Sequence, residues 1–390
     1  MWLSALIAVF AFAPTALGQT TSQPEKTEAQ PASVPAALSH EEIVAQCVQR
    51  LLDMQEGEHT AEWPYEGVYR VRGEIPIGYR IGGTGICGIA LLRAPGFTDD
   101  QPRRSAIVRA VHFVIDAAKH PLMNPEYDGG YDVRGWGYTY GLAFLLECKN
   151  AKAAPAELVD PVEATIKFFI DAIQRTEIAK VGGWNYARSQ GRDAVSPPSP
   201  FMTAPTLQVL FEAKKSGYEV DHEVIERGLS ALERGRTPTG SFRYSGVNGE
   251  TSREAVPGAV GRMLAAETTL YLAGRSSIAS VRSAIDAFIV HWQWLEQRRA
   301  KTGTHMGPYN IAPYYFYYAH YHAAQAVELL PEHERGEYRR RIHDLLMSTR
   351  SPEGTWNDRV FKRTANYGTA MSMMVVMMPN APAPATWAKP

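Results

Sequence analysis

The sequence has few cysteines and no excess of charge of either sign. Cys47, Cys87 and Cys148 are too few and too dispersed for a disulfide framework or a zinc site. One pair can still oxidise in an exporting compartment, but we favour free buried thiols because each cysteine lies among Ile, Leu and Val residues. Lysine and arginine number 40 against 41 acidic residues, and no basic stripe is present. Nucleic acid is therefore not an expected partner.

Long apolar runs are missing beyond the N-terminus. Residues 1–18 contain no charged side chain, are apolar from Trp2 to Phe12, and end in small residues before Gln19. This pattern predicts a signal peptide, with a retained N-terminal anchor as the alternative. The apolar stretch is shorter than the roughly 20 residues that a spanning helix needs. We therefore expect a secreted or periplasmic protein with no stable membrane span after cleavage.

Low-complexity composition marks the segment that follows. Residues 19–38 are rich in proline, serine, threonine, glutamine and alanine, with no hydrophobic period, which predicts a disordered linker. The chain as a whole is 45% apolar, so the remainder can form a large core.

Two kinds of helical segment alternate along that remainder. Six segments carry one apolar stripe opposite a charged face; they lie around residues 44–51, 107–114, 162–173, 225–232, 281–295 and 342–346. Six others are apolar or small on nearly every face; they begin near residues 85, 137, 202, 256, 312 and 366. A helix without a polar face is buried all round. The alternation predicts an all-α fold, an α/α toroid of six helix pairs with the striped helices outside. A flat solenoid is the alternative, but it exposes one face of the apolar helices.

The loops between paired segments share a glycine, a variable residue and an aromatic. The pattern occurs at residues 129–131, 182–184, 240–242 and 354–356. The unit of striped helix, glycine-x-aromatic loop and small-residue helix resembles the prenyltransferase and squalene-cyclase repeat, most clearly in GGWNY at 182 and GTWND at 354. The resemblance implies a terpenoid-cyclase-like toroid domain over residues 39–380, followed by a C-terminal tail at 381–390.

The chemistry of these families is not evident in the sequence. Squalene-type cyclases use an Asp-x-Asp-Asp acid, whereas the one Asp pair here, Asp99 and Asp100, lies in a hydrophilic loop. Protein prenyltransferases hold zinc with Asp, Cys and His. Here His320 and His322 point apart on a helix and have no Asp or Cys beside them. We therefore expect no metal and no cofactor, and the resemblance does not imply either activity.

Arginines and aromatics are concentrated where the inner helices begin. In a toroid these loops gather at one end, together with six helix N-termini. The candidate ligand-binding residues are Arg134, Trp136, Trp184, Tyr186, Arg188, Phe242, Arg243, Tyr244, Tyr309, Trp356 and Asp358, with Tyr79, Arg80 and Arg359 beside them. Guanidinium groups, aromatic faces and helix N-termini suit carboxylate or sulfate ligands, including acidic sugars. The alternative is that the aromatics plug the ring and the arginines bind loop carbonyls.

We call the end of the ring where these loops gather the ring mouth. At the ring mouth we expect the side chains of Arg134, Arg188 and Arg243 to project into one cavity together with those of Trp184, Tyr244 and Trp356.

One inner helix also contains candidate catalytic residues. Tyr315, Tyr318 and His322 follow helical spacing and share a face. If that face lines the cavity, one of them can act as a general base; if it meets a neighbouring helix, they are packing residues, which we favour.

Three functions remain open, and whether the protein is an enzyme is undecided. The first is an exported toroid that binds an anionic or polymeric ligand at the ring mouth without catalysis. The second is a secreted, lyase-like carbohydrate-active enzyme that uses Tyr, His and Arg in the same place. The third is a divergent isoprenoid enzyme, against which the missing acid and zinc motifs count.

Overall fold

The computed structural model describes residues 38–128, 133–186, 196–245 and 255–387. The chain divides into two units, residues 1–38 and 39–390, and the fold below is that of the second unit. Its helices are α1 (His40–Asp53), α2 (Ile77–Arg93), α3 (Gln101–Ala118), α4 (Arg134–Asn150), α5 (Val159–Arg175), α6 (Pro200–Lys215), α7 (His222–Gly235), α8 (Val256–Leu272), α9 (Ile278–Glu296), α10 (Tyr315–Val327), α11 (Glu332–Met347) and α12 (Ala365–Met377). Short 3-10 helices and isolated bridges complete the described residues, which contain no strand. The all-α prediction is confirmed.

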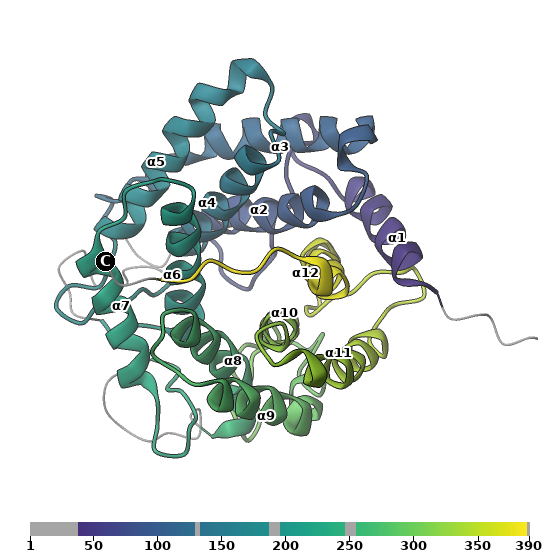
Figure 1. The fold of residues 1–390 in the computed structure, drawn as a ribbon. Coiled ribbons are helices and arrows are strands. Elements are labelled where there is room, and N and C mark those ends of the chain that lie inside the picture. The colour runs from purple at the N-terminus through teal and green to yellow at the C-terminus, as the bar shows by residue number, and fades with distance from the viewer. Residues whose placement is uncertain (1–37, 129–132, 187–195, 246–254, 388–390) are drawn as a thin grey trace, which may run out of the picture. The chain divides into compact units, whose positions relative to one another are not determined.

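The helices alternate between an inner and an outer ring. Every residue of α2 is buried except Arg80 and Arg93, whereas α11 buries only Ile342 and Leu346. Each even-numbered helix contacts the next one, and α12 contacts α2, which closes the inner ring (Figure 1). The odd-numbered helices pack outside their partners. The six helix pairs of an α/α toroid are therefore present, as the alternation of striped and apolar segments predicts.

Small residues allow the inner helices to approach one another. A Cβ atom added at Gly85 of α2 would lie 2.3 Å from the carbonyl oxygen of Tyr140 in α4. One added at Gly78 would lie 2.4 Å from the carbonyl oxygen of Val133. Both separations are too short for any side chain, so glycine at these positions sets the spacing of α2 and α4.

In three of the loops, a tryptophan forms hydrogen bonds with both the preceding outer helix and the following inner helix. The indole Nε1 of Trp184 donates to the Ile173 carbonyl of α5 at 2.8 Å, and its backbone N–H donates to Thr203 Oγ1 of α6 at 3.0 Å. Trp63 and Trp356 make the same two bonds, to Leu51 and Thr84 and to Leu346 and Thr369 respectively. The recurring aromatic is therefore a packing residue of the repeat. We call Trp63, Trp184 and Trp356 the linking tryptophans.

The described part of the C-terminal tail packs on the ring. After α12 the chain runs back across the inner helices toward α6 and α7 (Figure 1). The backbone N–H of Ala385 donates to Glu212 Oε1 at 2.7 Å, and that of Trp387 donates to the Leu272 carbonyl at 3.0 Å. The Trp387 ring stacks with the rings of Phe211 and His222. Residues 381–387 therefore form part of the folded unit.

The three cysteines are buried and free. Among the described residues, none of the helices combines the length and the apolar composition needed to cross a membrane.

Candidate functional site

All six helix pairs contribute to one cavity where the inner helices begin. We call it the tyrosine cavity; it is lined by Tyr65, Tyr69, Tyr79, Trp136, Tyr186, Phe201, Tyr244, Thr304, His305, Tyr314, Tyr318, Arg359 and Tyr367. Its volume is about 40 Å³. That is room for only a few water molecules, since a cavity needs about 10 to 15 Å³ to hold one. The cavity therefore admits a small group such as a carboxylate, while a larger ligand has to lie across its rim.

Arg359 is the one arginine or lysine among the lining residues. Its side chain is only 4% exposed, and its Nε donates to the Tyr65 hydroxyl at 3.0 Å. The guanidinium also lies 5.4 Å from the centre of the Tyr314 ring. No carboxylate of the described residues forms an ion pair with it. Arg359 therefore presents a positive charge to the cavity, with the Tyr65 hydroxyl as its acceptor and no ion pair to a carboxylate of the described residues.

Asp358 lies directly behind this wall. Its side chain is 0% exposed, and neither carboxylate oxygen has a hydrogen-bond partner in the described residues. Burial raises the pKa of Asp358 to about 7, against the lowering effect of the Arg359 and Arg299 charges. Burial raises the pKa of Tyr65 and of Tyr367, which line the cavity; Arg359 lowers that of Tyr65, and the charge of Asp358 raises both. Asp358 is thus a buried acid next to the tyrosine cavity, although it does not line it.

Several predicted residues do lie in the cavity. Trp136, Tyr186 and Tyr244 line it, as do Tyr79 and Arg359, which the sequence places beside the candidates. Trp136 contacts the Tyr79 ring edge-on, with the ring centres 5.5 Å apart. The structure therefore brings together aromatic side chains that are far apart in the sequence.

Other predicted aromatics lie outside the cavity, which corrects the expectation of a shared site. Trp184 and Trp356 are linking tryptophans whose indole N–H groups are bonded to outer-helix carbonyls. Phe242 is fully buried beneath the Arg236 guanidinium, and Tyr309 packs against Trp294 with the ring centres 4.9 Å apart. Packing between helices accounts for the position of all four.

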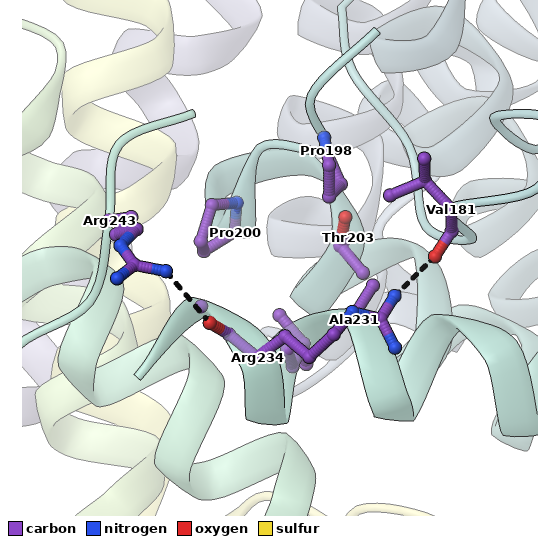
Figure 2. Close-up of a pocket in the computed structure, with 9 residues that line it drawn as sticks. Val181, Pro198, Pro200, Thr203, Ala231, Arg234 and Arg243 are labelled. Atoms are coloured by element: carbon purple, nitrogen blue, oxygen red, sulfur yellow. Dashed lines mark hydrogen bonds between the residues drawn. The ribbon is translucent and has the colours of Figure 1, made fainter. Parts of the chain in front are cut away.

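The predicted arginines also differ from the expectation. Arg134 is 2% exposed and donates to the carbonyls of Asn124 and Tyr127, the latter at 2.7 Å. Arg243 donates to the Arg234 carbonyl at 3.4 Å, at the edge of a separate narrow crevice (Figure 2). These two side chains bind loop and helix carbonyls and do not share the cavity. Arg188 lies outside the described residues.

Arg80, which we placed beside the candidates, is bound to an acid. It donates to both carboxylate oxygens of Glu62, at 2.7 and 2.6 Å.

The three candidate catalytic residues do not meet in one cavity. Tyr318 lines the tyrosine cavity, and its hydroxyl donates to the Phe201 carbonyl at 3.4 Å. Tyr315 stacks on the Phe201 ring, with the centres 4.4 Å apart. The His322 ring packs on the Tyr318 ring, with the ring centres 4.4 Å apart, but His322 lines a different cavity at the other end of α10.

The described residues contain no group of three His, Cys, Asp or Glu side chains placed to hold a metal ion.

Sequence reasoning missed part of the lining, although a signal for it exists. Tyr65, Tyr186 and Tyr244 each follow the loop aromatic by two residues. The aromatic packs between the helices and the tyrosine two residues later lines the cavity. In the last unit the same position after Trp356 is occupied by Asp358. No comparable spacing marks Tyr69, Phe201, His305, Tyr314 or Tyr367.

Comparison with known proteins supports the fold. No family model matches the sequence, and no curated protein sequence is significantly similar to it. An unsaturated glucuronyl hydrolase from Streptococcus agalactiae superimposes with a TM-score of 0.58 at 12% identity, covering 90% of this chain and 95% of its own. The corresponding enzyme from Bacillus sp. GL1, responsible for the degradation of glycosaminoglycan, has a TM-score of 0.56 at 11% identity, with coverages of 87% and 96%.

A second kind of protein has the same architecture. The type II terpene cyclase MstE from Scytonema superimposes with a TM-score of 0.50 at 13% identity, covering 87% of this chain and 98% of its own. Likeness at this level of identity extends to the fold alone. The chain therefore has the α/α toroid fold that terpene cyclases share with glycoside hydrolases, as the resemblance to the squalene-cyclase repeat implied.

Proposed function

We propose that the toroid binds an acidic sugar at the mouth of the tyrosine cavity, with the carboxylate of the ligand paired to Arg359. The observation that carries the proposal is a buried arginine that faces a cavity and has no ion pair with a carboxylate of the described residues. A neutral hydroxyl does not neutralise its buried charge, so an anion that reaches Arg359 gains a strong, weakly screened interaction.

The shape and chemistry of the cavity support this class of ligand. The narrow volume fits a carboxylate, and the sugar ring then lies on the rim beside Tyr69, which is 40% exposed. Tyrosines offer both an apolar face and a hydroxyl, as a hydroxyl-rich ring requires. An extended hydrocarbon chain has no room here. The two glucuronyl hydrolases with the same fold act on acidic sugars according to their names, which is consistent with the proposal.

We also propose that the protein acts outside the cytoplasm. The uncharged apolar stretch of residues 1–18 supports this part of the proposal. Mass spectrometry of protein from the native host tests it: we expect an N-terminus near Gln19, and an intact Met1 in a cytoplasmic fraction contradicts the proposal.

Calorimetry with a matched pair of ligands tests the binding site. The pair is a tetrasaccharide that contains glucuronic acid and the same tetrasaccharide with its carboxylates reduced to alcohols. We expect the wild type to prefer the acidic form by about tenfold or more, since a hydrogen bond to a charged group contributes about 1.5 to 3 kcal/mol. Added salt should weaken the binding of the acidic form.

Two arginine variants locate the interaction. Arg359→Gln should remove the preference for the acidic form, while Arg243→Gln, which lies in the separate crevice, should keep it. Melting curves by circular dichroism check that both variants are folded. Equal affinity of the wild type for the two tetrasaccharides, or loss of the preference in Arg243→Gln, contradicts the proposed site.

Asp358 favours a second candidate function, a carbohydrate-active enzyme in which this residue acts through the cavity wall. Asp358 does not line the cavity, but its charge lies next to Arg359 and Tyr65, which do. Because burial raises the pKa of Asp358 to about 7, this charge changes near neutral pH. Incubation with acidic oligosaccharides, followed by chromatography of the products, tests it. We expect new sugar products with the wild type and none with Asp358→Asn; an unchanged oligosaccharide with the wild type leaves binding without catalysis as the function.

A further inference from the structure

A second cavity lies at the opposite end of the inner ring, and we call it the tail-side cavity. Its volume is about 250 Å³. Helices α2, α4, α6, α10 and α12 supply its wall, and residues Ala381 to Ala385 of the C-terminal tail cover part of it. An aromatic layer separates it from the tyrosine cavity: Trp136 of one cavity contacts Tyr140 of the other, with the ring centres 5.1 Å apart. The two cavities are therefore distinct sites.

The charged residues around the tail-side cavity neutralise one another. Arg93 forms a bidentate pair with Glu147, at 3.0 and 3.1 Å. Lys215 lies 3.6 Å from the carboxylate of Glu212, which also accepts from the Ala385 backbone. The rest of the wall is largely apolar and includes Ile86, Ile89, Leu146, Val209, Met371 and Met374. Such a wall favours an uncharged, mostly apolar ligand.

A chain of hydrogen bonds runs from Thr269 to His322 at this cavity, and each bond fixes which atom of the next residue is the donor. The Thr269 hydroxyl donates to the Ala265 carbonyl at 2.8 Å, so its oxygen accepts from Gln208 Nε2 at 2.9 Å. Gln208 Oε1 then accepts from Gln325 Nε2 at 3.0 Å. Gln325 Oε1 is left as an acceptor, 3.2 Å from Nδ1 of His322. Because an amide oxygen cannot donate, Nδ1 of His322 must carry the proton.

The other ring nitrogen of His322 is consequently an acceptor. His322 is 2% exposed and lines the tail-side cavity, and no described residue donates to its Nε2. Burial lowers the pKa of His322 to about 4, so the ring is neutral at pH 7. A ligand with an O–H group that enters the cavity can donate a hydrogen bond to this acceptor.

We propose that the tail-side cavity binds a neutral, apolar molecule bearing one hydroxyl group, which donates to Nε2 of His322. The volume exceeds the engineered cavity of about 150 Å³ that is known to admit benzene in another protein. Methionines such as Met371 and Met374 can adjust to the shape of a hydrocarbon body. The inference does not depend on the function proposed for the tyrosine cavity.

Two nearly identical probes test the hydroxyl requirement. 2-Naphthol has an O–H donor, whereas 2-methoxynaphthalene has the same ring system and no donor. We expect the wild type to bind 2-naphthol at least about tenfold more tightly, because an unsatisfied buried acceptor costs about 1 to 3 kcal/mol. The measurement is a fluorescence titration with the full chain. Equal affinity for the two probes, or no binding of either, contradicts the proposal.

Four variants, one of them a substitute for another, identify the cavity that the probe occupies. His322→Phe should bring the affinities for the two probes together, and Ala143→Trp, which fills the cavity from α4, should abolish binding of both. His322→Leu, which also lacks an acceptor, serves in place of His322→Phe if melting curves show that the latter is unfolded. If Arg359→Gln weakens 2-naphthol binding and His322→Phe does not, the probe occupies the tyrosine cavity and the proposal is wrong.

Discussion

At the scale of a single residue, Asp358 is a buried acid whose effect on stability depends on pH. Its pKa is about 7 in the folded protein, against 3.8 for an exposed aspartic acid. The folded state therefore binds more protons between these values, and the stability that the protonated side chain contributes is lost as the pH rises through 7.

Asp358→Asn removes this titration and keeps a neutral side chain of similar size. We expect its free energy of unfolding, relative to that of the wild type, to rise between pH 5 and pH 8 by at least about 1 kcal/mol, since one unit of pKa corresponds to about 1.4 kcal/mol. Urea denaturation at the two pH values measures the difference. A difference that stays constant means that Asp358 is already ionised in the folded protein at pH 5.

The candidate site was only partly predictable, because the direction of a side chain depends on the partners that it meets in the fold. The sequence predicts which loops carry the glycines and the aromatic residues. It does not reveal that Trp184 turns toward the outer helix while Tyr186 faces the cavity, because that depends on the partners each side chain meets. The same holds for Arg134, whose carbonyl partners at Asn124 and Tyr127 lie in a loop with no periodic signal.

At the scale of the elements, the helices follow from the sequence and the C-terminal tail does not. Apolar periodicity separates a helix such as α11, with one buried stripe, from one such as α2, which is buried on nearly every face. Residues 381–387 alternate alanine and proline before Thr386 and Trp387, and such a segment has no period that reveals where it packs. The position of the tail depends on the surface that α6 and α8 form once the ring has folded.

Trp387 is the side chain that anchors the tail. Its ring lies 5.5 Å from that of Phe211 and 5.7 Å from that of His222, measured between centres, with the Lys214 ammonium 4.7 Å away. Trp387→Ala should therefore release the tail while the helices stay folded. We expect the amides of Ala385 and Trp387 (alanine in the variant), which donate to Glu212 and Leu272, to exchange hydrogen at least about tenfold faster.

Hydrogen exchange followed by mass spectrometry measures this effect, with peptides from α2 and α4 as internal references. Exchange that accelerates equally in those helices means that the tail contributes to the global stability of the ring. Unchanged exchange in the tail means that the backbone bonds hold it without the indole.

At the scale of the whole molecule, α1 packs outside the point where α12 meets α2 and the inner ring closes. This helix packs on α12, and Arg50 Nε donates to the Glu353 carbonyl at 2.9 Å. Ile43, Cys47 and Leu51 of α1 are fully buried. The helix begins with a capping box, in which Glu42 N–H donates to Ser39 Oγ at 3.2 Å and Ser39 N–H donates to Glu42 Oε2 at 2.7 Å. Both residues of the capping box that stabilises the N-terminus of α1 are therefore retained in a chain that begins before Ser39.

Two truncations that differ only by this helix test the role of α1. A chain beginning at Leu38 retains the capping box and every element of the ring, so we expect it to melt at the temperature of the full chain. A chain beginning at Met54 lacks α1 and exposes the apolar face of α12, so we expect no cooperative transition, since removing one large buried apolar side chain alone costs about 2 to 5 kcal/mol. Thermal melting by circular dichroism measures both. A lower melting temperature for the first chain means that residues before Leu38 support the ring, and a cooperative transition in the second means that eleven helices close it without α1.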